Sequence, residues 1–457
     1  MIQKIKCSII VGYILMSFSP VFAAPQVQKV ISPKHKIEAW LIEAHNVPLV
    51  SMQFSFLGGA GQDSNEKAGL SQFTCALMDE GAGDFTAETF QRKLDELAMR
   101  FGFNADSDRI YGNVQYISKN KDESLNLLKQ ALEQPRFDEE PLERIRQQTI
   151  ASIERKKENP NILVAEKAFA SVYPNHPYGR PLSGTVESVK TFIQDDCKNF
   201  VKNRFAKEGL IIGVAGDITP EDLAKILDDL FGNLTEKHVV KALPAIQPTL
   251  DGQLHTIQLA DRPQTVSVFM QQGIDRHHPD FYAAYILNQI LGGGSFQARL
   301  MTEVRTKRGL TYGIHTQLQW LDQTQFMMGS CATENDRFYE SFDVIKAVYK
   351  NLASTGPTEE ELNEAKSYIT GSFALMLDNT KSIAQFLLRM QKDKLGIDFL
   401  EKRNDFIRAV SADQIKKVAH DFLSPDKLTF FAAGNPKEGG SSRGVLPDDV
   451  SPGLAVN

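Results

Sequence analysis

The stretch Leu291-Gly-Gly-Gly-Ser-Phe-Gln-Ala-Arg-Leu-Met-Thr-Glu-Val-Arg-Thr-Lys-Arg-Gly-Leu-Thr-Tyr-Gly313 decides how the rest of the chain is interpreted. Its three glycines, Gly292, Gly293 and Gly294, end an apolar run with helical spacing. A second helical pattern follows and stops at Gly309, and a strand is predicted over residues 312–318. The stretch therefore predicts a helix, a tight turn and a strand in immediate succession.

Arg305 and Tyr312 lie on either side of the predicted turn. A guanidinium and a phenol held in this way can both donate hydrogen bonds to one developing oxyanion. A surface arginine with an apolar stem and a half-buried tyrosine would give the same sequence pattern. The spacing alone therefore leaves a catalytic and a structural interpretation open.

Strand and helix patterns are clustered along the chain instead of alternating strictly. Residues 49–57 alternate apolar and polar side chains like a strand, and residues 266–272 are the counterpart in the second half. An amphipathic helix is predicted over residues 86–101, with Thr86 as its N-cap. Clustering of this kind favours an α+β fold over a doubly wound parallel sheet.

The sequence contains an internal duplication. A helix, an acidic break and a second helix over residues 123–160 recur over residues 341–379, and each half ends in a helix and a strand before a glycine. A period near two hundred residues indicates duplicated domains and not a solenoid. We predict homologous domains at 24–235 and 252–435, joined by a linker at 236–251 that contains Pro244 and Pro248.

Both ends of the chain have a distinct composition. Lys4 and Lys6, an apolar run over residues 9–18 and a small-residue cleavage site before Ala24 predict a signal peptide at residues 1–23. The run is too short to span a bilayer, so we expect an exported protein, periplasmic or secreted, without a membrane span. Residues 436–457 are rich in Gly, Ser and Pro and predict a disordered tail.

Size and charge limit the classes of function. The chain has 457 residues, of which 42% are hydrophobic and 24% are charged, and this length suggests two domains or more. Its formal net charge is −6. Because no basic excess is available to neutralise phosphates, nucleic acid is not expected as a partner.

The opening stretch resembles the second-domain signature of the pitrilysin/insulinase family of zinc metallopeptidases. That signature has a glycine-rich segment, Arg-Leu, and then Arg-x-Lys-x-x-Leu-x-Tyr; here Arg299-Leu300 and Arg305 to Tyr312 match it. The resemblance implies catalytic roles for Arg305 and Tyr312, which in the family reach a zinc site on a different domain and help to hold the substrate carbonyl. It also leads us to assign the glycine run, Gly292 to Gly294, to substrate binding.

The resemblance covers about residues 26–436, and it implies a particular fold. Each of the two homologous domains should be a mostly antiparallel sheet flanked by helices. Family members form a clamshell of four such domains, from one long chain or from two shorter chains as in processing-peptidase-like members. This chain has the length of one half of the clamshell.

The family's zinc motif, His-x-x-Glu-His on a helix followed by a distant Glu, is absent from this chain. The landmarks around it are present, since residues 56–63 and 69–71 match the segments that precede the motif and begin its helix. Gln72 and Ala76 stand where the two His belong, Cys75 replaces the Glu, and counting from Asn159-Pro160 places Ser152 at the distant ligand. Since only Cys75 is a plausible ligand and no base remains, we predict no bound metal.

Two main functions follow from this combination of lost and retained motifs. The leading hypothesis is the zinc-less subunit of an exported two-chain metallopeptidase that degrades or processes peptides. A homologous partner subunit would carry the zinc, and this chain would supply Arg305 and Tyr312. The alternative is a non-catalytic scaffold or peptide-binding protein, and a self-sufficient peptidase with an unrecognised site is a third.

Overall fold

The computed structural model describes residues 26–437. The predicted signal peptide, residues 1–23, and the predicted disordered tail from residue 438 onward lie outside the described residues. Among residues 26–437, no helix has both the length and the apolar character that a bilayer crossing requires.

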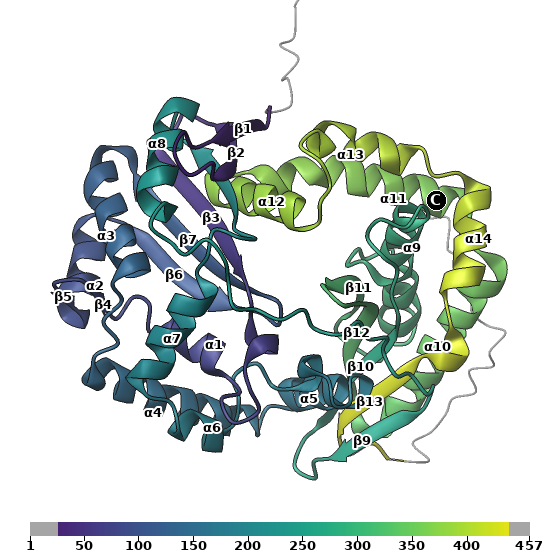
Figure 1. The fold of residues 1–457 in the computed structure, drawn as a ribbon. Coiled ribbons are helices and arrows are strands. Elements are labelled where there is room, and N and C mark those ends of the chain that lie inside the picture. The colour runs from purple at the N-terminus through teal and green to yellow at the C-terminus, as the bar shows by residue number, and fades with distance from the viewer. Residues whose placement is uncertain (1–25, 438–457) are drawn as a thin grey trace, which may run out of the picture.

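The chain forms two α+β domains, each built on one large sheet (Figure 1). The first sheet has the order β1-β2-β8-β3-β7-β6 and the second has the order β11-β12-β10-β13-β9. The strands of the first are β1 (Gln28–Ile31), β2 (Glu38–Glu43), β3 (Leu49–Leu57), β6 (Arg100–Ala105), β7 (Arg109–Ile117) and β8 (Ile211–Gly216). The strands of the second are β9 (Leu254–Gln258), β10 (Gln264–Gln272), β11 (Ile314–Leu321), β12 (Thr324–Glu334) and β13 (Thr429–Gly434).

The pairing of the strands confirms the duplication. In the first sheet β2 and β8 are parallel, and the pairs β8–β3, β3–β7 and β7–β6 are antiparallel. In the second sheet β9 and β13 are parallel, and the pairs β13–β10, β10–β12 and β12–β11 are antiparallel. The two sheets therefore share one topology, and β1 is an addition at the edge of the first.

One cross-strand pair recurs at the same place in both sheets. Phe54 on β3 pairs with Gly112 on β7, and Phe269 on β10 pairs with Gly329 on β12. A Cβ at Gly112 would lie 2.2 Å from Phe54 Cζ, and a Cβ at Gly329 would lie 2.2 Å from Phe269 Cε2. Each glycine therefore makes room for a buried phenyl ring that lies across the neighbouring strand.

Helices flank both sheets. In the first half they are α1 (Leu70–Ala76), α2 (Ala87–Glu96), α3 (Lys121–Glu133), α4 (Glu139–Lys156), α5 (Pro160–Val172), α6 (Val186–Lys190), α7 (Gln194–Arg204) and α8 (Pro220–Phe231). In the second half they are α9 (Phe281–Gly292), a π-helix (Met301–Thr306), α10 (Phe338–Thr355), α11 (Glu359–Gly371), α12 (Thr380–Lys392), α13 (Phe399–Arg408) and α14 (Ala412–Phe422). A short ribbon, β4 (Gly81–Ala82) with β5 (Phe85–Thr86), precedes α2.

Two predicted boundaries were wrong. The helix predicted over residues 86–101 ends at Glu96, because Ala98 adopts a left-handed conformation with φ 49° and the chain then enters β6 at Arg100. The strand predicted from Tyr312 begins at Ile314. The predicted N-cap is correct, since Thr86 Oγ1 accepts a hydrogen bond from the Thr89 amide.

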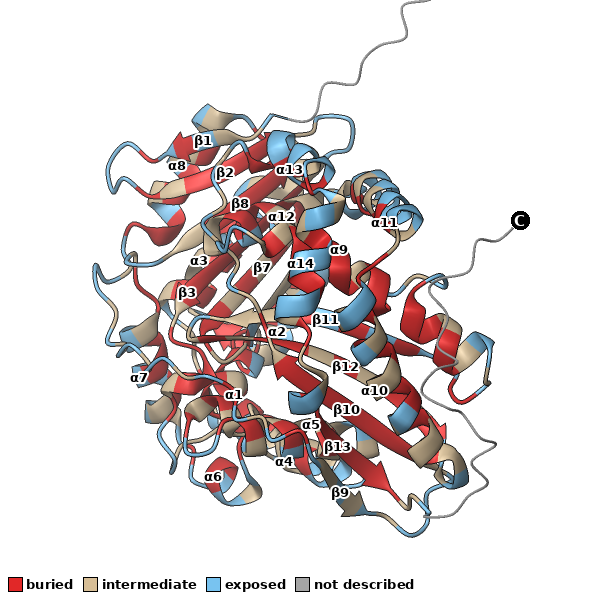
Figure 2. Ribbon diagram, turned by 90° about the vertical axis from the view of Figure 1, so that its right-hand side faces the viewer, coloured by how far each residue is buried: buried red, intermediate tan, exposed pale blue. Residues whose placement is uncertain are grey.

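Each half of the chain places one helix on the sheet of the other half. Helix α5 packs on the second sheet, where Val164 and Ala168 share a buried cluster with Val266 and Val268 of β10. Helix α12 packs on the first sheet, where Leu387 and Met390 share a buried cluster with Trp40 of β2. Because of this exchange, the central strands β3 and β10 are buried on both faces (Figure 2).

Helix α12 approaches the first sheet most closely at Gly213 on β8. A Cβ at this position would lie 2.3 Å from the carbonyl oxygen of Ala384 and 2.8 Å from the amide nitrogen of Leu388. The atoms in the way belong to the helix backbone, which cannot move aside as the end of a flexible side chain can. The Gln391 amide, which donates to the Ile212 carbonyl at 2.7 Å, fixes the helix at the same level.

We expect Gly213→Ala to destabilise the protein by about 1–3 kcal/mol through overpacking between β8 and α12. Thermal unfolding followed by circular dichroism measures the effect as a lower Tm. Gly102→Ala on β6 is the matched control, because a Cβ there meets only Asn113 Nδ2, at 3.5 Å. Equal Tm values for the two variants would contradict the proposed contact.

A second contact between the domains involves Asp108, which lies between β6 and β7. Its carboxylate accepts hydrogen bonds from the Tyr178 hydroxyl at 2.6 Å and from the backbone amide of Asp322 at 2.9 Å. Asp322 lies in the β11–β12 turn of the second domain. Burial, with a smaller contribution from the nearby Asp322 carboxylate, raises the pKa of Asp108 to about 6.

This pKa predicts a pH dependence. The folded protein holds the Asp108 proton more tightly than an unfolded chain, in which the pKa is near 3.8, so ionisation costs stability as the pH rises between 3.8 and about 6. Asp108→Asn loses one of the two acceptor oxygens at every pH, so we expect its Tm relative to wild type to be more favourable above this window than below it. A Tm difference that does not change with pH would show that Asp108 is ionised at no cost.

Candidate functional site

The positions that the resemblance assigns to zinc ligands meet in one pocket of the first domain. Gln72 and Ala76 on α1 line it together with Ser152 on α4. The pocket is open to solvent. Glu154, the nearest carboxylate to Ser152 in the sequence, is exposed and pairs with Lys157 at 2.9 Å. The assignment of Ser152 to the distant ligand position therefore has a geometric basis.

The residues in this pocket do not fit a zinc ion. Within residues 26–437 no group of three His, Cys, Asp or Glu side chains could hold a metal ion. Cys75 is buried in the hydrophobic core of the first domain and does not line the pocket. Burial raises the pKa of its thiol, which disfavours the thiolate that a metal would need.

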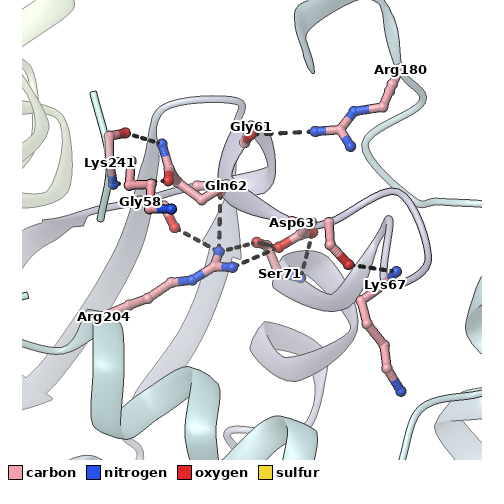
Figure 3. Close-up of polar contacts among 11 residues, drawn as sticks. Gly58, Gly61, Gln62, Asp63, Lys67, Ser71, Arg180, Arg204 and Lys241 are labelled. Atoms are coloured by element: carbon pink, nitrogen blue, oxygen red, sulfur yellow. Dashed lines mark hydrogen bonds and ion pairs between the residues drawn. The ribbon is translucent and has the colours of Figure 1, made fainter. Parts of the chain in front are cut away.

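A buried ion pair holds α1 in place although its motif is lost (Figure 3). Asp63 accepts hydrogen bonds from the amide and the hydroxyl of Ser71, at 3.0 and 2.7 Å, in the first turn of α1. Arg204, at the end of α7, pairs with Asp63 at 2.9 Å and donates to the Gly58 carbonyl at 2.8 Å. The exposed fractions of the Asp63 and Arg204 side chains are 1% and 11%. Removing one partner of such a pair typically costs about 3–5 kcal/mol.

The sequence pattern identified the Asp63 side of this network but missed Arg204. Residues 56–63 stood out as a landmark, whereas Arg204 is one of several basic residues on an exposed-looking helix. Arg204 acts through its contact with Asp63, which lies 141 residues away in the sequence. A single sequence carries no local signal for such a contact.

Arg305 and Tyr312 line a second pocket, in the C-terminal domain, together with Gln264, Glu334 and Arg337. Arg305 lies in the last turn of the π-helix, and the chain then turns at Gly309, which has φ +60°. The Tyr312 side chain follows, and 87% of the residue is exposed. The structure therefore brings the two predicted catalytic residues together, but in a pocket separate from that of Gln72, Ala76 and Ser152.

The basic residues of this segment have different partners. Arg299 is buried and paired with Glu361 at 2.7 Å. Lys307 and Arg308 both pair with the buried Glu303, at 2.7 and 2.6 Å. By contrast, no carboxylate among the described residues pairs with Arg305, whose guanidinium lies 5.1 Å from the ring centroid of Phe296. Arg305 is therefore available to a ligand, and the other three are held by the fold.

Phe296 was missed in the sequence analysis. It is 72% exposed, and its cation–π contact is the one that orients Arg305. A phenylalanine two residues after a run of glycines is the signal that could have identified it.

The three glycines assigned to substrate binding have different environments. Gly292 is buried at the end of α9, where a Cβ would lie 2.7 Å from Thr316 Oγ1. Gly293 packs on Gln289. Gly294 has φ +90° and lines a pocket together with His315 and Ser330. The substrate-binding role of the three remains a prediction.

Comparison with known proteins identifies both halves of the chain. Residues 40–186 match the family model for insulinase (peptidase family M16), and residues 191–369 match the model for the peptidase M16 inactive domain. A non-peptidase homologue, YmxG, from Helicobacter pylori is 22% identical over 397 residues, covering 87% of this chain and 91% of its own.

Solved structures agree with these matches. A peptidase M16 inactive domain from Pseudomonas fluorescens superimposes with a TM-score of 0.82 and 27% identity, covering 90% of this chain and 98% of its own. A protease from Helicobacter pylori has a TM-score of 0.79 at 16% identity, covering 90% of this chain and 99% of its own. The chain therefore belongs to the insulinase family, peptidase family M16, and lacks that family's zinc-binding motif.

Proposed function

We propose that this chain is the zinc-less subunit of an exported two-chain metallopeptidase that degrades or processes peptides. A homologous partner subunit carries the metal motif in this proposal. Arg305 and Tyr312 donate hydrogen bonds to the carbonyl oxygen of a peptide held between the two chains. The N-terminal charge and hydropathy pattern supports export to the periplasm or beyond.

The observation that carries the proposal is that Arg305 has no carboxylate partner among the described residues. Glu303 and Glu361 hold the other basic residues of the segment, whereas Arg305 faces a pocket beside an exposed tyrosine. A guanidinium with no carboxylate partner among the described residues and an exposed phenol in the same pocket can both donate hydrogen bonds to one ligand. Donors fixed before substrate arrives contribute most in the transition state, so they affect turnover more than binding.

The second candidate is a non-catalytic scaffold or peptide-binding protein. The similarity to a relative named as a non-peptidase homologue favours it. The two candidates differ in one measurable respect, because only the first requires Arg305 and Tyr312 for peptide cleavage by a complex.

We expect the purified chain alone to hold less than stoichiometric zinc after dialysis. Gln72, Ala76 and Ser152 offer no anionic ligand, and burial keeps the Cys75 thiol protonated. Elemental analysis measures the zinc content, with a family member that has the intact motif purified in parallel. One tightly held zinc per chain would overturn this prediction and direct attention to Cys75.

We expect Tyr312→Phe to lower the kcat of the reconstituted two-chain enzyme by roughly a hundredfold, or ~3 kcal/mol, because it deletes a single oxyanion donor. Arg305→Lys should also lower kcat, since a point charge cannot replace a planar fork. Cleavage of a quenched peptide gives kcat, and size-exclusion chromatography gives assembly, which neither change should affect.

Matched controls are available for both substitutions. Tyr368→Phe removes a hydroxyl from another exposed tyrosine, and Arg408→Lys alters an exposed arginine that pairs with Asp405. Neither control should change kcat. Normal cleavage by both Tyr312→Phe and Arg305→Ala would reject the catalytic proposal in favour of the scaffold.

A further inference from the structure

The pocket at the positions of the lost zinc motif is lined by both apolar and polar residues, and Lys156 is the one charged side chain among them. Its polar side chains come from α1, from α4 and from the loop before α6; they are Gln72, Gln148, Thr149, Ser152, Lys156 and Ser183. No Asp or Glu lines it. In a zinc site, electron-pair donors such as His and Glu surround a bound metal cation. In this pocket the positive charge belongs to a protein side chain, Lys156.

Lys156 is held with its ammonium in the pocket. It lies four residues after Ser152 on α4, which places both side chains on one face of the helix. Its Nζ donates to Ser183 Oγ at 2.7 Å. An ammonium has three donors, so two remain, and the Ser183 hydroxyl proton is left to donate to a ligand.

No carboxylate within the described part of the chain forms an ion pair with Lys156. Glu166 on α5 is the acidic group that senses its charge: burial raises the pKa of Glu166, and Lys156 partly offsets this. The next residue, Lys157, is exposed and pairs with Glu154 at 2.9 Å. The two adjacent lysines therefore differ: Lys157 pairs with a carboxylate outside the pocket, whereas Lys156 lines the pocket and forms no salt bridge among the described residues.

We infer that this pocket is a carboxylate site that takes the C-terminal carboxylate of a peptide. Lys156 would form a charge-assisted hydrogen bond to one carboxylate oxygen, and the hydroxyls of Ser152, Ser183 and Thr149, which line the same pocket, would donate to the other. Binding of this kind involves no bond cleavage. The inference concerns this chain alone and depends neither on a partner subunit nor on Arg305.

The test measures binding of two dye-labelled alanine hexapeptides to the purified full chain by fluorescence anisotropy. One peptide ends in a free carboxylate and the other in an amide. We expect the free acid to bind with at least tenfold lower Kd, since hydrogen bonds to charged groups contribute about 1.5–3 kcal/mol. A contribution of that size corresponds to a Kd of roughly 10–100 mM for acetate alone. Acetate at several hundred millimolar should therefore displace the free acid more than chloride at the same concentration, and equal effects of the two salts would show that the carboxylate is not the group recognised.

Three variants locate the site. Lys156→Met should weaken binding of the free acid about tenfold and remove the difference between the peptides. Lys157→Met makes the same charge change outside the pocket and should leave binding unchanged. Ser152→Glu adds a carboxylate four residues before Lys156, a favourable orientation for an ion pair on a helix, and should block binding.

Several results would overturn the inference. They are equal affinity for acid and amide, no saturable binding of the acid at millimolar concentrations, and equal losses for Lys156→Met and Lys157→Met. Because this assay contains no partner subunit and no cleavage, its failure leaves the kinetic test of Arg305 and Tyr312 unaffected.

Discussion

Helix α5 lies on the second sheet and α12 lies on the first, so each sheet completes its hydrophobic core with residues from the other half of the chain. Burial of both faces of β3 and β10 follows from this exchange. The relative position of the two domains is therefore set by core packing, to which Leu243, Ile246 and Leu250 of the linker contribute. Because α4 leads almost directly into α5, the pocket wall that carries Ser152 is tied to the second domain as well.

The first domain keeps the framework of a metal site without the metal ligands. Asp63 and Arg204 are buried charges, and Ser71 and the carbonyls of Gly58 and Gly59 compensate their desolvation by completing their hydrogen bonds. This framework fixes α1 against the sheet independently of any ion. Loss of the ligands could therefore leave the fold intact, while polar and basic side chains came to line the pocket.

Local patterns predicted much of the fold and part of the site. The alternation in residues 49–57, the repeated helix pairs and the Arg305–Tyr312 turn are short-range signals, and they gave the two α+β domains and the vacated ligand positions. The alternation did not predict that Ser51 and Ser55 are also buried, since α12, more than 300 residues away, covers that face. Arg204 and Lys156 were missed for the same reason, as their partners are distant in sequence.

The reciprocal placement of α5 and α12 also indicates how the chain evolved. A single ancestral domain of this kind would leave one face of its sheet uncovered, and two copies that traded the helix would cover both faces in a two-fold symmetric dimer. Joining two such genes end to end gives a chain with the topology described above. On this view the molecule is a fused homodimer whose halves have diverged, one keeping the pocket of Gln72, Ala76 and Ser152 and the other keeping Arg305 beside the exposed Tyr312.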